Sequence, residues 1–231
     1  MFIGHFGIGL GAKALQPRAS LGTLFIATQF VDLLWPNLLL LGLERVEIKP
    51  GITAATPLDF VHYPISHSLL MGLVWGLALG LGYWLWKRHL GSAVLVGLCV
   101  PSHWLLDLLM HRPDLPLFPG ASPLLGLGLW NHPLAGQLVE GLVFAGGLYL
   151  YLRRTTARNK TGVWALWGLV AFIVLVHAAN MLAPPPGSPT AVAWACQLMW
   201  LIMLWAYWAD RNRRPRHQVP APSEPALVVA G

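Results

Sequence analysis

The chain has 231 residues, of which 56% are hydrophobic and only 10% are charged, and its formal net charge is +6. Soluble domains carry about 25% charged residues, so this composition excludes an ordinary water-soluble globule. The length has room for about six helices of about 20 residues, which is what crossing a hydrocarbon core of about 30 Å requires. The composition therefore predicts an all-α, polytopic membrane protein.

Six apolar stretches follow one another and are expected to be transmembrane helices. They cover residues 21–43, 65–86, 91–110, 134–152, 163–182 and 191–208. Before them, the Gly-rich apolar residues 1–15 lack the basic start and the cleavage site of a secretory signal, and predict an interfacial or re-entrant helix. No strand is expected. Residues 1–209 are therefore expected to form one integral membrane domain, and the proline-rich residues 210–231 a disordered cytoplasmic tail.

Lys and Arg are divided unevenly between the two sets of connections. Twelve lie before the first span, after the last one, or in the connections that follow the second and fourth spans, whereas only Arg45, Lys49 and Arg112 lie in the others. Because positive residues favour the cytoplasmic side, both termini are predicted to be cytoplasmic. Membrane lipids are then the expected partners of the basic residues, and nucleic acid is not, since the short connections hold no soluble basic domain.

The third span contains the most specific pattern, formed by His103, Asp107 and His111. Positions four apart on a helix differ by only about 40° around its axis, so the three side chains share one face. Imidazole and carboxylate together suit zinc, iron or manganese. All three residues are predicted metal ligands. The alternative is a hydrogen-bonded polar group that holds helices together.

Two further histidines flank the start of the second span. Pro64 favours a helix start near Ile65, because proline is tolerated in the first turn of a helix. His67 would then lie one turn inside the helix, and His62 in the loop just outside it. Both are predicted ligands, with His67 the stronger candidate. Alone, such a pair is often a solvated interfacial group.

Acidic residues inside the spans are candidates for catalysis. Asp32 lies about eleven residues into the first span, near the middle of the bilayer. A carboxylate there must be protonated, paired or bound to a metal, so Asp32 is predicted both as a ligand and as a catalytic residue. Glu140 in the fourth span is a second candidate for proton transfer. His177 in the fifth span is a weaker one, because an isolated histidine on an apolar helix is more often a hydrogen-bonded core residue.

Several of these motifs occur in an order that resembles the YdjM-like family of inner-membrane metal-dependent hydrolases. They are Gly4-His5-Phe6-Gly7-Ile8-Gly9, Asp32, the spacing from His62 to His67 with Ser66-His67-Ser68, and Ser102-His103-Trp104-Leu105-Leu106-Asp107. The resemblance covers about the first half of the chain. It implies a multi-pass protein of the bacterial inner (plasma) membrane with a metal centre at the positions His5, Asp32, His67, His103 and Asp107.

Two features qualify this resemblance. The family often has a second acidic residue soon after the first-span aspartate, where this chain has Leu33-Leu34-Trp35, which argues against a two-metal site. In addition, a cytoplasmic N-terminus and an outward-facing pocket are compatible with His5 as a ligand only if residues 1–15 enter the membrane.

The function predicted from these residues is that of a membrane-bound metal-dependent hydrolase. It would hold a divalent metal, most simply zinc, and act at the outer face on a small molecule, or more specifically a lipid or lipid-linked ester. A proton or metal transporter and a non-catalytic membrane scaffold with a structural metal are the alternatives. The loop 111–133, rich in Pro and Gly, is expected to be a turn-rich lid over the pocket.

Overall fold

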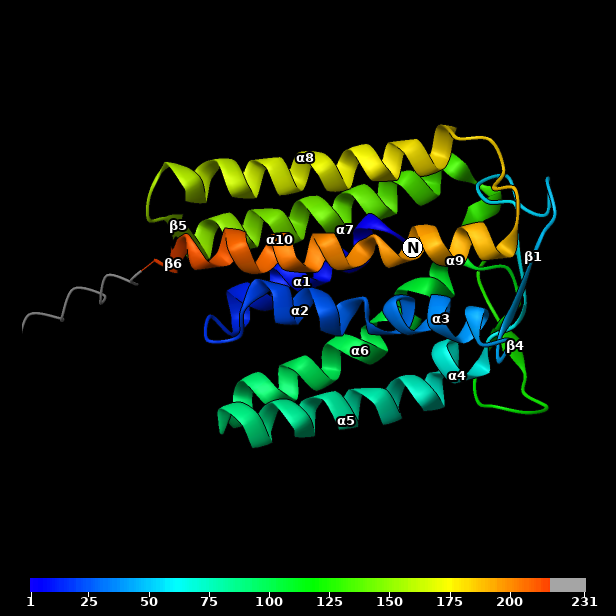
Figure 1. Cartoon of the computed structure of the whole chain (residues 1–231), viewed down its shortest axis with the longest axis horizontal. Helices are drawn as coiled ribbons and strands as arrows, with labels where there is room; N and C mark the ends of the chain where they lie inside the picture. Colours follow the sequence, from blue (N-terminus) through cyan, green and yellow to red (C-terminus); the bar gives the residue numbers. More distant parts are fainter. Residues whose placement is uncertain (217–231) are drawn as a thin grey trace, which may run out of the picture.

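The computed structural model describes residues 1–216, which form one elongated bundle of helices (Figure 1). The α-helices of this part of the chain are α1 (Ile3–Leu15), α2 (Leu21–Thr28), α3 (Phe30–Leu40), α4 (Pro64–His67), α5 (Leu69–Lys87), α6 (Leu90–Met110), α7 (Pro133–Arg154), α8 (Lys160–Leu182), α9 (Pro189–Gln197) and α10 (Met199–Arg211). Helices α5 and α6 lie on one side, α7 and α8 on the other, and α2, α3, α9 and α10 between them. The predicted all-α architecture is confirmed.

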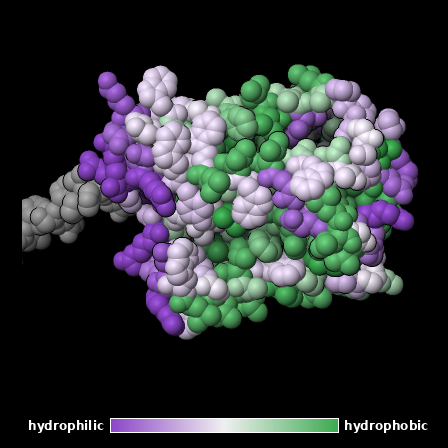
Figure 2. Space-filling view, in the orientation of Figure 1, coloured by the Kyte–Doolittle hydropathy of each residue, from purple (hydrophilic) through white to green (hydrophobic). Residues whose placement is uncertain are grey.

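Five helical segments are long and apolar enough to cross a membrane. They are α5, α6, α7, α8 and the continuous run of α9 and α10. Helices α2 and α3 are together apolar enough for a sixth span, but they are bent by 55° at the break between them, which fits either a broken span or a re-entrant loop. Large apolar side chains such as Leu77, Leu134 and Leu142 are mostly exposed, and Figure 2 shows a hydrophobic band across the middle of the molecule. The chain is a multi-pass membrane protein whose outer surface suits lipid.

Helix α1 lies inside the bundle, packed against α7, α2 and α6. At 1.5 Å per residue its 13 residues cover about 20 Å, too short to cross the bilayer. Glycines allow its close approach to α7, because a Cβ built on Gly147 would lie 1.9 Å from the carbonyl oxygen of Gly7. The N-terminal segment predicted from the sequence is thus an internal helix that can carry His5 into the protein.

Two predicted spans are interrupted beside candidate ligands. The first breaks at Gln29, between α2 and α3, and the second at Ser68, between α4 and α5. The Ser68 side chain caps α5 by accepting a hydrogen bond from the amide of Met71 at 3.3 Å. Helix α4 begins at Pro64, as proline in a first helical turn predicts.

The segments that connect or follow the helices contain short antiparallel strand pairs, which the sequence does not predict. They are β1 (Arg45–Ile48) with β2 (Leu58–His62), β3 (Leu115–Pro116) with β4 (Leu124–Leu125), and β5 (Thr155–Ala157) with β6 (Arg213–Pro215). The first two pairs and α4 lie at one end of the bundle, here the α4 end, and the third pair at the opposite, β5–β6 end (Figure 1). The loop 111–133 contains β3, β4 and a 3-10 helix, Leu129–Asn131, in keeping with the turn-rich loop expected there.

The β5–β6 end is the more basic one, and Figure 2 shows hydrophilic residues gathered there. One of the basic side chains at this end, Arg213 in β6, is held in place by hydrogen bonds. The buried Arg213 donates hydrogen bonds to the Thr155 hydroxyl at 3.1 Å and to the Gly162 carbonyl at 3.1 Å. Helix α10 and β6 therefore structure the beginning of the stretch that the sequence predicts to be a disordered tail, and residues 217–231 lie outside the described part.

Candidate metal centre

Five of the predicted ligands come together inside the bundle. The group, here called the His/Asp cluster, consists of His5 from α1, Asp32 from α3, His67 from α4, and His103 and Asp107 from α6. It contains two overlapping sets, His5 with His103 and Asp107, and Asp32 with His67 and His103; within each set the ligand atoms lie within 4.8 Å of one another. The cluster joins residues from four helices that are distant in sequence.

Helix α6 supplies the pair at the centre of the cluster. His103 Nε2 lies 3.1 Å from Asp107 Oδ2, one turn further along the same face. His111, at the C-terminal cap of α6, approaches the same oxygen more loosely, with its Nε2 3.9 Å away. The shared face predicted from the four-residue spacing is therefore present, with His111 at its edge.

The second oxygen of Asp107 faces the N-terminal helix. His5 Nε2 lies 3.1 Å from Asp107 Oδ1, and the amino group of Met1 lies 2.5 Å from the same atom. His5 is 1% exposed and Asp107 2%. The burial of α1 thus brings His5 to a side of the carboxylate that α6 leaves open.

Asp32, in α3 of the broken first span, contacts the two histidines His67 and His103. Its Oδ1 lies 3.2 Å from His67 Nε2 and 3.6 Å from His103 Nε2. Its side chain is 26% exposed, whereas those of the four other members are nearly inaccessible. Asp32 is therefore the carboxylate of the cluster that water reaches most readily.

The break between α2 and α3 also determines the protonation of His103. In a continuous helix the Thr28 carbonyl would accept the amide of residue 32, but here it lies 2.8 Å from His103 Nδ1. A carbonyl oxygen only accepts hydrogen bonds, so His103 Nδ1 carries a proton. The Nε2 atom, which faces Asp32 and Asp107, is then unprotonated and has a free lone pair, unless the ring takes up a second proton.

His111 is held in the same way by groups outside the membrane-spanning helices. Its Nδ1 lies 2.9 Å from Asp114 Oδ1, which also accepts a hydrogen bond from the Tyr63 hydroxyl at 3.2 Å. Burial raises the pKa of Tyr63 well above its usual value, so the hydroxyl stays protonated and donates. Burial lowers the pKa of His111, which favours the neutral ring with Nε2 free to bind. Arg112 pairs with Asp114 and Asp59 and holds this network in place.

These contacts fit a bound cation. A neutral imidazole nitrogen and a carboxylate oxygen are both acceptors, so their close approach is favourable only with a proton or a positive ion between them. Metal-binding histidines usually donate their other ring N–H to a carbonyl or carboxylate, as His103 does to Thr28 and His111 to Asp114. The donor set of imidazole nitrogen and carboxylate oxygen is one that divalent transition metals accept.

Other predicted site residues lie elsewhere. His62, at the end of β2, is exposed and belongs to neither set. Glu140 Oε2 accepts hydrogen bonds from the amides of Phe2 at 2.8 Å and Gly4 at 3.5 Å, so this carboxylate holds the start of α1. His177 Nε2 lies 2.6 Å from the Gln137 side-chain oxygen, which matches the alternative of a satisfied core histidine.

Sequence reasoning missed the residues that orient the ligands. Thr28 acts through a backbone carbonyl, for which no side-chain signal exists. Tyr63 and Asp114 lie in connections and resemble ordinary loop residues. Ser66 is next to His67 in the Ser-His-Ser motif, and this adjacency is the one local signal that could have found it.

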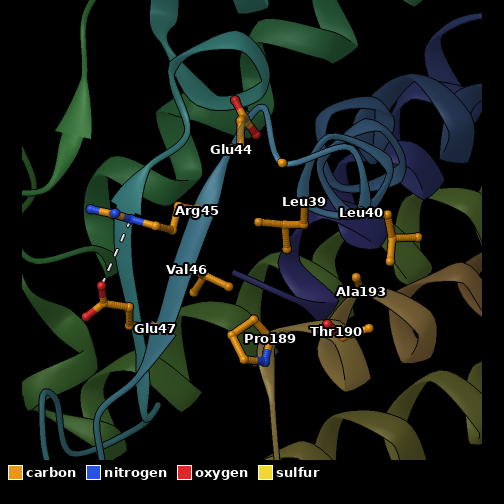
Figure 3. A pocket seen from close by; sticks show the side chains of 10 residues that line it. Leu39, Leu40, Glu44, Arg45, Val46, Glu47, Pro189, Thr190 and Ala193 are labelled. Carbon is orange, nitrogen blue, oxygen red and sulfur yellow. Dashed lines mark ion pairs between the residues drawn. The ribbon is translucent and has the colours of Figure 1, made fainter.

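An open groove at the α4 end is lined by none of the five cluster residues. It has a volume of about 390 Å³ and runs between the end of α3, β1 and the start of α9 (Figure 3). Its walls include Leu39, Val46 and Ala193, and Glu44 lies at its margin. A second, narrow crevice between α4, α5 and α6 is lined by His67 and His103 themselves.

No protein-family model, curated protein or solved structure matches this chain. The function of the cluster is therefore argued from its own geometry, and the resemblance to the YdjM-like family rests on the motifs alone.

Proposed function

We propose that the chain is a membrane-bound metal-dependent hydrolase whose His/Asp cluster holds a divalent cation, with zinc as the first candidate. The supporting observation is the direction of the hydrogen bonds around His103. Its Nδ1 donates to the Thr28 carbonyl while its Nε2 faces the carboxylates of Asp107 and Asp32. Three to four nitrogen and oxygen ligands of this kind are typical of zinc sites in enzymes.

The geometry favours a single ion. His103 belongs to both sets of possible ligands, and its Nε2 can bind only one cation at a time. The leucine that follows Asp32 agrees with this, because the second acidic residue that would serve a two-metal site is missing.

The three carboxylates Asp107, Asp32 and Glu140 have different roles in this proposal. When bound, a divalent cation supplies Lewis-acid activation of water and of a phosphoryl or acyl oxygen. Asp107 is buried and contacts His5 and His103 with different oxygens, which suits a ligand. Asp32 is the more exposed, which suits the group that accepts a proton from water. Glu140 is committed to the amides of α1 and is a positioning residue rather than a base.

The position of the cluster supports a lipid or lipid-linked ester as substrate. His103 and Asp107 lie in the half of α6 nearer the α4 end, and the crevice lined by His67 and His103 lies among membrane-spanning helices. The α4 end has few positive residues, which supports an outer position for it and a cytoplasmic position for the β5–β6 end. The expected cytoplasmic N-terminus does not fit this arrangement, because the amino group of Met1 lies inside the bundle beside Asp107. The motif resemblance supports the bacterial inner membrane as the location of the chain.

Transport of protons or metal is less well supported. The route would need Glu140 and His177 to continue the path from the cluster, but these side chains are bonded to the start of α1 and to Gln137. A scaffold with a structural metal shares the same cluster and differs only in having no substrate.

The test is metal analysis combined with activity. Wild type, His103→Ala and the exposed control His132→Ala are purified in detergent, analysed for bound metals, and assayed with a panel of phospholipids and esters and for ion uptake in vesicles. We expect about one ion per chain in wild type and control, almost none in His103→Ala, and hydrolysis only where metal is bound. Metal without hydrolysis would support the scaffold, uptake would support the transporter, and stoichiometric metal in folded His103→Ala would reject the ligand assignment.

A further inference from the structure

Glu44 is a buried carboxylate that the sequence does not single out. It lies in the connection between α3 and β1 and is only 3% exposed. Its Oε1 accepts the backbone amides of Ile65 and Ser66, each at 2.8 Å, and its Oε2 accepts the Ser66 hydroxyl at 2.6 Å. Three donors converging on one carboxylate match the ionised form.

The proton positions in this chain of contacts follow from what each group can do. An ionised carboxylate only accepts, so the hydroxyl proton of Ser66 points to Glu44. The Ser66 oxygen then accepts from His67 Nδ1, which lies 2.6 Å away. A competing contact from the hydroxyl to the Tyr63 carbonyl is longer, at 3.4 Å, and its acceptor is uncharged. His67 is therefore protonated on Nδ1, and its Nε2, which faces Asp32, is left to bind a metal ion or a second proton.

We propose that Glu44 is a positioning residue that acts through Ser66 to hold His67 in the tautomer and orientation that a metal ligand needs. This inference rests on the proposed metal-binding role of the cluster. Glu44 itself does not reach the cluster, since its three hydrogen bonds all go to the first turn of α4. The same bonds hold α4 in place, so that His67 is oriented both by its ring nitrogen and by its backbone.

Glu47 provides a control for the role of Glu44. Figure 3 shows Glu44 at the margin of the groove, next to α4, while Glu47 lies further along β1. The Glu47 side chain is 43% exposed and pairs with Lys49 at 3.0 Å, outside the chain of contacts to His67. Glu47→Gln therefore removes the same charge from the same strand region without touching Ser66, and serves as the matched control.

The first test determines by NMR, in metal-free protein, which ring nitrogen of His67 carries a proton. Metal-free protein with ¹⁵N-labelled histidine is compared by NMR as wild type, Glu44→Gln, Ser66→Ala and Glu47→Gln, with the His67 signal identified by its loss in His67→Gln. In Glu44→Gln the amide oxygen must accept the two backbone amides, so its NH₂ group faces Ser66 and turns the hydroxyl proton toward His67. We expect a proton on Nδ1 of His67 in wild type and control, whether or not Nε2 holds a second proton toward Asp32, and loss of the Nδ1 proton in Glu44→Gln.

Cobalt titration of the same proteins supplies the second readout. Loss of a group that orients a ligand histidine lowers metal affinity about 10- to 100-fold, which we expect for Glu44→Gln and Ser66→Ala but not for Glu47→Gln. Ser66→Thr, which keeps the hydroxyl, should restore the affinity. Ser66→Ala keeps the Glu44 bonds to the α4 backbone, so the test stands even if Glu44→Gln does not fold.

The two proposals fail in different ways. If wild type binds no cobalt, the proposed function is rejected while the tautomer measurement still decides the role of Glu44. Absence of a proton on His67 Nδ1 in wild type, or a His67 protonation pattern and cobalt affinity unchanged in both Glu44→Gln and Ser66→Ala, would overturn the role of Glu44.

Discussion

The imidazole rings of His5 and His103 stack face to face, with centroids 3.6 Å apart and planes 6° apart. Each ring directs Nε2 to a different oxygen of Asp107, at 3.1 Å in both cases. Two positively charged rings would repel each other in this buried contact, so at least one ring is neutral. A neutral His5 can donate Nε2–H to Asp107, which also contacts the Met1 ammonium, whereas His103 already uses its Nδ1–H for Thr28 and meets Asp107 only through a second proton or a metal ion.

The first prediction concerns the number of ions. Asp107→Asn and Asp32→Asn each keep the shape of the side chain and remove its charge. Because His103 is common to both sets of ligands, we expect each substitution to lower the affinity for one shared ion, by about 100-fold for the buried Asp107. Metal content and cobalt titration measure this effect. A wild type with two ions, and variants that each keep one at full affinity, would instead show two separate sites.

The second prediction concerns the contact between α1 and α7. Gly147→Ala places a Cβ 1.9 Å from the Gly7 carbonyl oxygen, whereas a Cβ at the neighbouring Gly146 meets nothing within 4 Å. We expect Gly147→Ala to lower the free energy of unfolding by about 1–3 kcal/mol, as overpacking does. It should also weaken metal binding, because α1 carries His5.

Thermal unfolding in detergent followed by circular dichroism measures the difference between these two variants, and Gly146→Ala should behave as wild type. Equal stability of both variants would mean that α1 does not pack against α7 as described.

The third prediction concerns the buried ion pair that joins α1 to α10. Lys13 Nζ lies 2.8 Å from Asp210 Oδ2, and the side chains are 7% and 11% exposed. Removing one partner leaves a buried charge unpaired, which typically costs about 3–5 kcal/mol. We expect Lys13→Met and Asp210→Asn each to destabilise strongly, and the double variant to lose less than the two effects added together. Additive losses in a double-mutant cycle would show that the pair is not coupled.

The fourth prediction concerns orientation. In a background without Cys99 and Cys196, cysteine is introduced at Arg45, at the α4 end, or at Arg154, at the β5–β6 end. Both positions are exposed. A membrane-impermeant maleimide added to intact bacterial cells, with the outer membrane made permeable, should label only the first variant, and lysis should expose the second. The reverse pattern would place the His/Asp cluster toward the cytoplasm and remove the basis for an outer-leaflet substrate.

Features that depend on local backbone geometry were predictable from the sequence. The apolar runs predicted five long helices and most of their boundaries, because a helix needs a fixed length to cross hydrocarbon, while the first predicted span became the bent pair of α2 and α3. The spacing of His103 and Asp107 placed them on one face, since the helical period is a property of the backbone. Pro64 determined the start of α4 for the same local reason.

Only the tertiary structure decided which polar groups meet. The break at Gln29 turns the Thr28 carbonyl toward His103, the burial of α1 brings His5 to Asp107, and the α3–β1 connection carries Glu44 to Ser66. His62 has the same side chain as His67 and lies close in sequence, yet it stays at the surface. Such contacts join segments far apart in the chain, and they depend on helix packing and on breaks in helices, which hydropathy and periodicity do not encode.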